Sequence, residues 1–150
     1  MKFRNFNLVG FVIYGRGCFN QLDEIISPHR DKGPMIFLVD HFFSAGSGGQ
    51  NNPLINRIPL HRNDKIIFAD VTYEPKTIYV DSLAKQLKDD PDNYRDGNVS
   101  GIVSIGGGST MDLAKAVSLM MNNPGSSADY QGWDLVKFPG VYKVGIPTLS

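Results

Sequence analysis

The sequence lacks cysteine pairs, an excess of charge of either sign and long apolar runs. Cys18 is the only cysteine among 150 residues, so no internal disulfide can form, and small disulfide-stabilised secreted folds are excluded. A single unpaired cysteine is typical of a reducing compartment, and we expect a cytoplasmic location. The length suits one ordinary domain with its own hydrophobic core.

The balance of charge excludes some classes of partner. Fifteen lysines and arginines offset fifteen aspartates and glutamates, so we expect neither nucleic acid nor an acidic membrane as a partner. The apolar run from Leu8 to Tyr14 is interrupted by Gly10 and is too short to cross a bilayer. Arg16 and its flanking glycines do not fit a signal-peptide cleavage site. The binding of a partner or ligand must therefore depend on a local cluster of residues and not on the net charge of the chain.

Three consecutive glycines mark the most regular stretch of the chain. The β-forming run 99–105 ends at Gly106, Gly107 and Gly108. Glycines let an anion approach the backbone closely, because no Cβ stands in the way. We therefore predict a strand that runs into a phosphate-binding turn.

A helix is predicted directly after these glycines. Ser109 is the predicted N-cap, because Asp112 three residues later completes a capping box. Apolar residues then recur at helical spacing, namely Leu113, Ala116, Val117, Met120 and Met121. The amides and the dipole of such a helix N-terminus favour an anion. The turn matches neither G-x-G-x-x-G nor the P-loop pattern, and a tight turn without a ligand is the alternative.

A second candidate group follows the run 35–39, whose continuous apolar character is typical of a buried parallel strand. Asp40 stands at the carboxyl end of that strand. In dinucleotide-binding folds a carboxylate there accepts hydrogen bonds from the adenosine ribose and repels a 2′-phosphate, which favours NAD over NADP. An aspartate that only caps the following turn is the alternative.

The rest of the pattern predicts an α/β fold with an open, mostly parallel, Rossmann-like sheet and helices on both faces. Further strands are predicted at 8–14, 65–71 and 142–146, and helices after Gly17 and after Glu74-Pro75. The segment 41–64 is the least regular and is predicted as a surface excursion. Ligands of such sheets bind beyond the carboxyl ends of the strands, where Asp40, the glycine turn and Thr148 should meet.

The glycine stretch also carries a resemblance. Residues 106–116, GGGSTMDLAKA, are similar to the G-G-G-S-x-x-D-x-A-K-A signature of the iron-containing (group III) alcohol dehydrogenases. Residues 146–150 resemble the start of that family's second signature, P-T-x-x-G-T-G. The resemblance implies that residues 1–150 are a dinucleotide-binding domain with a dehydroquinate synthase-like fold and with NAD as cofactor.

The resemblance also implies a role for each matching residue. The turn Gly107, Gly108 and Ser109 would hold the pyrophosphate, and Asp112 would lie near the nicotinamide-side ribose. Gly106 would also belong to the cofactor site. Thr148 and Leu149 would flank the cofactor. Glu74 stands where the family often has asparagine, which leaves a cofactor contact from that turn open.

By the same resemblance, the intact enzyme would transfer a hydride between an alcohol and nicotinamide, with divalent iron or zinc as Lewis acid. The family's metal ligands belong to a helical domain absent from this chain, so we predict no catalytic or metal-ligating residue here and no turnover by this chain alone. The substrate would be a small alcohol or a sugar acid, since 2–6 and 130–134 resemble members that act on a sugar acid. A homodimer is also implied, with Phe6 to Val9 as a pairing edge.

Two other functions share these features. Dehydroquinate synthase-like lyases have a related glycine turn, although their next helix is similar to D-x-x-G-F, unlike the residues from Asp112 to Lys115 here. A non-catalytic nucleotide-sensing module is the second alternative. The three histidines, His29, His41 and His61, lack the spacing of a metal site and are predicted to be surface residues.

Overall fold

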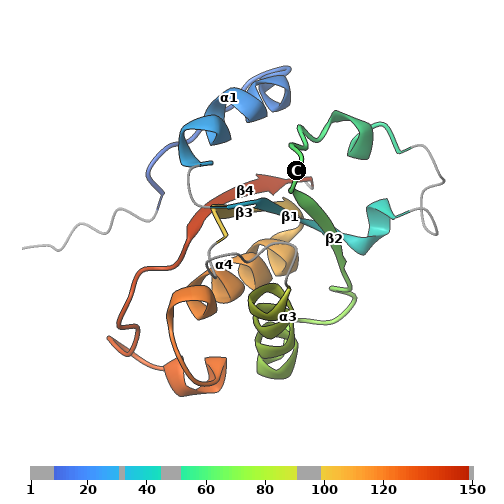
Figure 1. Cartoon of the computed structure of the whole chain (residues 1–150). Coiled ribbons are helices and arrows are strands. Elements are labelled where there is room, and N and C mark those ends of the chain that lie inside the picture. Colours follow the sequence, from blue (N-terminus) through green and yellow to red (C-terminus); the bar gives the residue numbers. More distant parts are fainter. Residues whose placement is uncertain (1–8, 31–32, 45–51, 91–98, 149–150) are drawn as a thin grey trace, which may run out of the picture.

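The computed structural model describes residues 9–30, 33–44, 52–90 and 99–148. Its centre is a four-stranded sheet in the order β2-β1-β3-β4, in which every neighbouring pair is parallel (Figure 1). The strands are β1 (Met35–Asp40), β2 (Lys65–Ala69), β3 (Gly101–Gly106) and β4 (Tyr142–Pro147). The predicted parallel α/β sheet is confirmed.

Helices cover both faces of this sheet, as predicted. In Figure 1, α3 and α4 lie below the sheet and the short α1 lies above it. The helices are α1 (Leu22–Ile26), α3 (Thr77–Asp89) and α4 (Gly108–Asn122). Short 3₁₀ turns are η1 (Cys18–Gln21), η2 (Ser27–His29), η3 (His41–Phe43), η4 (Ile55–Arg57) and η5 (Ser127–Tyr130). Among these described helices, none is both long and apolar enough to cross a membrane.

The core forms on the two central strands, because alternate side chains of a strand point to opposite faces. Ile36 and Leu38 of β1 pack towards α3 and α4, whereas Phe37 and Val39 pack towards α1. All of β3, and all of β1 except Asp40, is buried. Burial on both faces explains why the sequence shows continuous apolar runs at these strands.

The predicted strand at 8–14 is wrong over its described residues, 9–14, which form no strand. Phe11 is 90% exposed and Tyr14 is 89% exposed. β-forming residues need a neighbouring strand to pack against, and within the described chain this run has none. The segment 41–64, predicted as a surface excursion, also differs from expectation. Ile58 is part of the buried core, and the described parts of the segment contain the 3₁₀ turns η3 and η4.

Candidate functional site

The carboxyl ends of three neighbouring strands bring together the groups expected there. Asp40 ends β1 and Gly106 ends β3, and these two strands are paired. Thr148 follows β4, and its amide donates a hydrogen bond to the carbonyl of Gly106 at 3.1 Å. The structure therefore places Asp40, the glycine turn and Thr148 on one edge, as the sequence predicts. Leu149 lies outside the described residues.

Helix α4 begins without a side-chain cap. Gly107 is its N-cap, with an extended backbone (φ −81°, ψ −173°), and the amide of Met111 donates to the Gly107 carbonyl at 3.1 Å. The amides of Gly108, Ser109 and Thr110 precede this first helical hydrogen bond, and they are the groups that a helix N-terminus offers to an anion.

The predicted capping box at Ser109 is therefore wrong. The helix starts at Gly108, two residues earlier than an N-cap at Ser109 would give, so Ser109 lies inside the first turn and cannot cap it from outside. The absence of a cap favours ligand binding, because no side-chain oxygen of the described chain accepts a hydrogen bond from the first amides of α4.

The first and third glycines have different surroundings. A Cβ on Gly106 would lie 2.4 Å from the Thr110 Oγ1 atom and 3.0 Å from the Asp40 Cβ atom. A Cβ on Gly108 would meet no atom of the described chain within 4 Å. Gly106 thus allows α4 to approach the sheet, whereas Gly108 leaves open space beside the helix amides.

Asp40 is held at both carboxylate oxygens. Its Oδ1 accepts a hydrogen bond from the Phe42 amide at 3.0 Å, and its Oδ2 accepts one from the Thr110 hydroxyl at 3.5 Å. The side chain remains 21% exposed. Asp40 therefore caps the turn η3, as the alternative interpretation has it, and still presents its carboxylate at the carboxyl edge of the sheet.

A histidine stands between two carboxylates at this edge. The His41 Nδ1 atom lies 3.5 Å from Oδ1 of Asp40 and 3.9 Å from Oδ1 of Asp70. The hydroxyl and then the amide of Thr72 donate to Asp70, and they lower the pKa of its carboxyl. Sequence reasoning placed His41 on the surface and missed this arrangement. The available signal was that Asp40 and Asp70 both directly follow strand residues.

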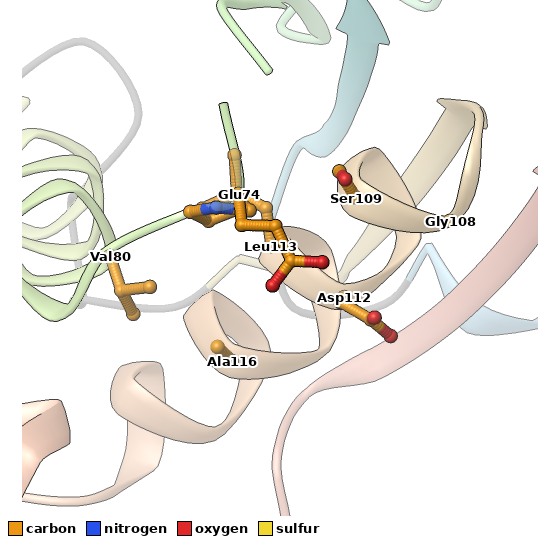
Figure 2. A pocket seen from close by; sticks show the side chains of 8 residues that line it. Glu74, Val80, Gly108, Ser109, Asp112, Leu113 and Ala116 are labelled. Carbon is orange, nitrogen blue, oxygen red and sulfur yellow. The ribbon is translucent and has the colours of Figure 1, made fainter. Parts of the chain in front are cut away.

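A pocket of about 450 Å³ lies between the N-terminal ends of α3 and α4. Figure 2 shows Glu74 reaching it from the segment before α3, and Ser109 and Asp112 reaching it from α4. Asp112 is exposed and pairs with Lys115 at 2.8 Å. The pocket thus gathers Gly108, Ser109 and Asp112 of the predicted site, while Asp40, Gly106 and Thr148 are outside its lining.

The described residues do not fit a metal centre. Within those ranges, no group of three or more histidine, cysteine, aspartate or glutamate side chains lies close enough to hold a metal ion. His41 has only two carboxylates near it, and His61 contacts Asp23 at 2.9 Å.

Comparison with known sequences gives one matching family and several individual relatives. The sequence profile of the iron-containing alcohol dehydrogenases matches residues 10–150. The NAD-dependent methanol dehydrogenase of Bacillus methanolicus is 40% identical over 146 residues, which are 97% of this chain and 36% of that protein. Alcohol dehydrogenase 4 of Schizosaccharomyces pombe is 26% identical over 147 residues, which are 97% of this chain and 32% of that protein. The chain thus spans about a third of the length of these relatives.

Solved structures share the fold. Sulfoacetaldehyde reductase from Bifidobacterium kashiwanohense, in complex with NAD⁺, superposes with a TM-score of 0.67 at 24% identity. The aligned part is 89% of this chain and 33% of the reductase chain. An alcohol dehydrogenase from Oenococcus oeni superposes with a TM-score of 0.65 at 16% identity. The aligned part is 91% of this chain and 33% of the dehydrogenase chain. The profile match, which spans nearly the whole sequence, identifies this chain as a member of the iron-containing alcohol dehydrogenase family.

Proposed function

We propose that this chain is the NAD-binding part of an alcohol dehydrogenase that oxidises an alcohol to an aldehyde or ketone. Family membership supports an oxidoreductase, and the 40% identical methanol dehydrogenase is NAD-dependent. The observation that carries the proposal is the uncapped N-terminus of α4, with open space at Gly108, on the same edge as the Asp40 carboxylate.

Each group has a task suited to its chemistry. The turn from Gly107 to Ser109 would bind the pyrophosphate, because the free amides of Gly108 and Ser109 belong to the helix end that carries positive partial charge and Gly107 adjoins them. Asp40 would accept hydrogen bonds from the adenosine ribose hydroxyls. Asp112 would lie near the ribose on the nicotinamide side, with Thr148 and Leu149 flanking the cofactor.

Bound NAD would supply the hydride acceptor for the alcohol carbon. The residues of this chain would bind and orient that cofactor. The iron or zinc ion expected for the family would be held by ligands outside this chain, since the described residues offer no cluster for it. Residues 1–150 would accordingly form the dinucleotide-binding domain.

Titration calorimetry of NAD⁺ and NADP⁺ against the chain tests this proposal. We expect NAD⁺ to bind at least tenfold more tightly, because the Asp40 carboxylate repels a 2′-phosphate. Asp40→Asn keeps the shape and removes the charge, so it should narrow this preference. Failure of the unmodified chain to bind either dinucleotide would overturn the proposal, and binding without alcohol oxidation by the complete reading frame would favour a sensing module.

For the substrate we propose a sugar acid, 3-deoxy-manno-octulosonate, oxidised at its terminal C8 alcohol. This proposal is supported by the resemblance of residues 2–6 and 130–134 to family members that act on it. The complete reading frame that contains this sequence, supplied with Fe²⁺ or Zn²⁺, should form NADH faster with this sugar acid than with methanol or ethanol. Equal or faster oxidation of the simple alcohols would contradict the sugar-acid assignment alone.

We also propose a homodimer that pairs through the N-terminal segment. Of the predicted edge, Phe6 to Val9, only Val9 lies in the described residues, where the apolar run continues to Tyr14. Val9, Phe11 and Val12 are exposed, and unpaired β-forming residues tend to add to another strand edge. Light scattering should give twice the monomer mass, and Phe11→Glu should shift the protein towards the monomer. A monomeric unmodified protein would contradict this proposal.

A further inference from the structure

Thr110 carries a buried hydroxyl between the two halves of the proposed cofactor site. It lies in the first turn of α4, two residues after Gly108, and it is 0% exposed. Its hydroxyl donates to Asp40 Oδ2 at 3.5 Å, from a position 70 residues further along the chain. Thr110 thus connects the helix end that would hold phosphate to the carboxylate that would hold ribose.

This hydroxyl behaves differently from another buried hydroxyl on the same helix. Ser118 donates to the carbonyl of Lys115 at 2.8 Å, which is the local bond that a helical serine or threonine commonly makes. Thr110 instead has a carboxylate as its acceptor. A buried hydroxyl requires a partner, so its contact with Asp40 constrains the rotamers of both side chains.

The packing at the end of β3 fixes this contact. A Cβ on Gly106 would lie only 2.4 Å from the Thr110 hydroxyl oxygen, so the bare glycine makes room for the threonine. The Phe42 amide holds the other oxygen of Asp40 at 3.0 Å. With a donor at each oxygen, the carboxylate plane is oriented. The His41 Nδ1 atom also lies 3.5 Å from the oxygen that the Phe42 amide holds, so the oxygen beside Thr110 is the one left to accept from the ribose hydroxyls.

We propose that Thr110 is a positioning residue for cofactor recognition: it orients Asp40 for the adenosine ribose and thereby strengthens the preference for NAD over NADP. The inference assumes the proposed NAD binding. Because Thr110 and the pyrophosphate-binding amides share one helical turn, the same residue also fixes the spacing between the phosphate and ribose subsites.

The test compares Thr110→Val with Thr110→Ser, using two ligands. Valine nearly preserves the volume and removes the hydroxyl, whereas serine keeps the hydroxyl. ADP probes both subsites, and 2′,3′-dideoxy-ADP probes the phosphate subsite without the hydroxyls that Asp40 would bind. We expect Thr110→Val to weaken ADP about fivefold, as for one lost hydrogen bond, and to leave 2′,3′-dideoxy-ADP unchanged. Thr110→Ser should retain most of the ADP affinity.

Other results would overturn the inference in distinct ways. Equal weakening of both ligands by Thr110→Val would assign Thr110 a packing role only, and unchanged ADP affinity would remove any role. In an Asp40→Asn background, Thr110→Val should have little further effect on ADP, and a full additional loss would also contradict the proposal. Should Thr110→Val fail to fold, Thr110→Ala provides the same comparison. If the unmodified chain binds neither NAD⁺ nor ADP, the proposed function itself fails.

Discussion

Gly106 and Gly108 are two residues apart, yet the packing of the chain requires glycine only at the first of them. At Gly106 an added methyl group would collide with Thr110 and approach Asp40, so the protein's own packing excludes any side chain. At Gly108 an added methyl group would meet nothing of the described chain. Packing within the described chain therefore explains the glycine at 106 and not the one at 108, where the proposed function would place the pyrophosphate.

The largest effect should come from Gly106→Ala. The new Cβ would lie 2.7 Å from the Thr110 Cβ atom, so α4 or the end of β3 must shift. Overpacking of this kind costs about 1–3 kcal/mol. We expect chemical denaturation to show a free energy of unfolding lowered by that amount, with weaker binding of NAD⁺ as well. An unchanged free energy of unfolding would contradict the conclusion that packing excludes a side chain at position 106.

Gly108→Ala is the matched substitution on the open side of the turn. We expect the stability to be unchanged or slightly raised, because alanine favours a helix more than glycine does. The methyl group would stand where the pyrophosphate approaches, so the affinity for NAD⁺ should fall about tenfold. Calorimetry and thermal unfolding of the same preparation would check both parts. Equal affinity would remove the argument for a ligand at this position.

A substitution away from the turn calibrates the stability measurements. On α3, Asp81 accepts hydrogen bonds from the Ser126 hydroxyl at 2.6 Å and from the Ser127 amide at 2.7 Å. Chiefly the Ser126 hydroxyl holds the pKa of Asp81 below its ordinary value of 3.8. Because the folded-state pKa is lowered, this stabilisation is present above about pH 4 and is lost as the pH falls through the folded-state value.

Asp81→Asn should therefore lower the free energy of unfolding by about 1 kcal/mol or less at pH 7, since water competes for these bonds. The difference between variant and parent should shrink below pH 3.8. NAD⁺ affinity should not change. A change in that affinity would show that stability and binding are not separable in this chain.

The smallest expected effect concerns charge in the pocket. Glu74 lines the same pocket as Ser109, so its carboxylate would stand near a bound pyrophosphate. Glu74→Gln should strengthen NAD⁺ binding about twofold at low salt, and the gain should vanish at high ionic strength. Glu24→Gln, on α1 across the sheet, removes the same charge and should change nothing. Equal gains from both variants would indicate a general charge effect.

The sequence was sufficient for the central strands and for the placement of Asp40 and the glycine turn. A parallel strand buried on both faces appears as a continuous apolar run, and the residue after it necessarily lies at the sheet edge. The segment 9–14 could not be assigned in this way. Its residues favour a strand, but whether a partner edge exists is a property of the whole assembly.

The details of the site were harder to predict, because they depend on single-residue boundaries and on distant contacts. A shift of two residues at the start of α4 turned Ser109 from a cap into a helical residue and left the amides uncapped. The contact between Thr110 and Asp40 joins positions 70 residues apart, so local spacing carries no signal for it.

The hydrogen bond from the Thr148 amide to the Gly106 carbonyl has a further consequence. A trans peptide unit is planar, with its carbonyl and its N–H on opposite sides. Since the carbonyl of Gly106 is turned towards β4, the N–H of Gly107 is turned the other way, towards the strand that ends at Asp40. The main chain alone therefore aims this donor, and any residue with a backbone N–H can make the same bond at position 148, whereas proline, which has no N–H, cannot.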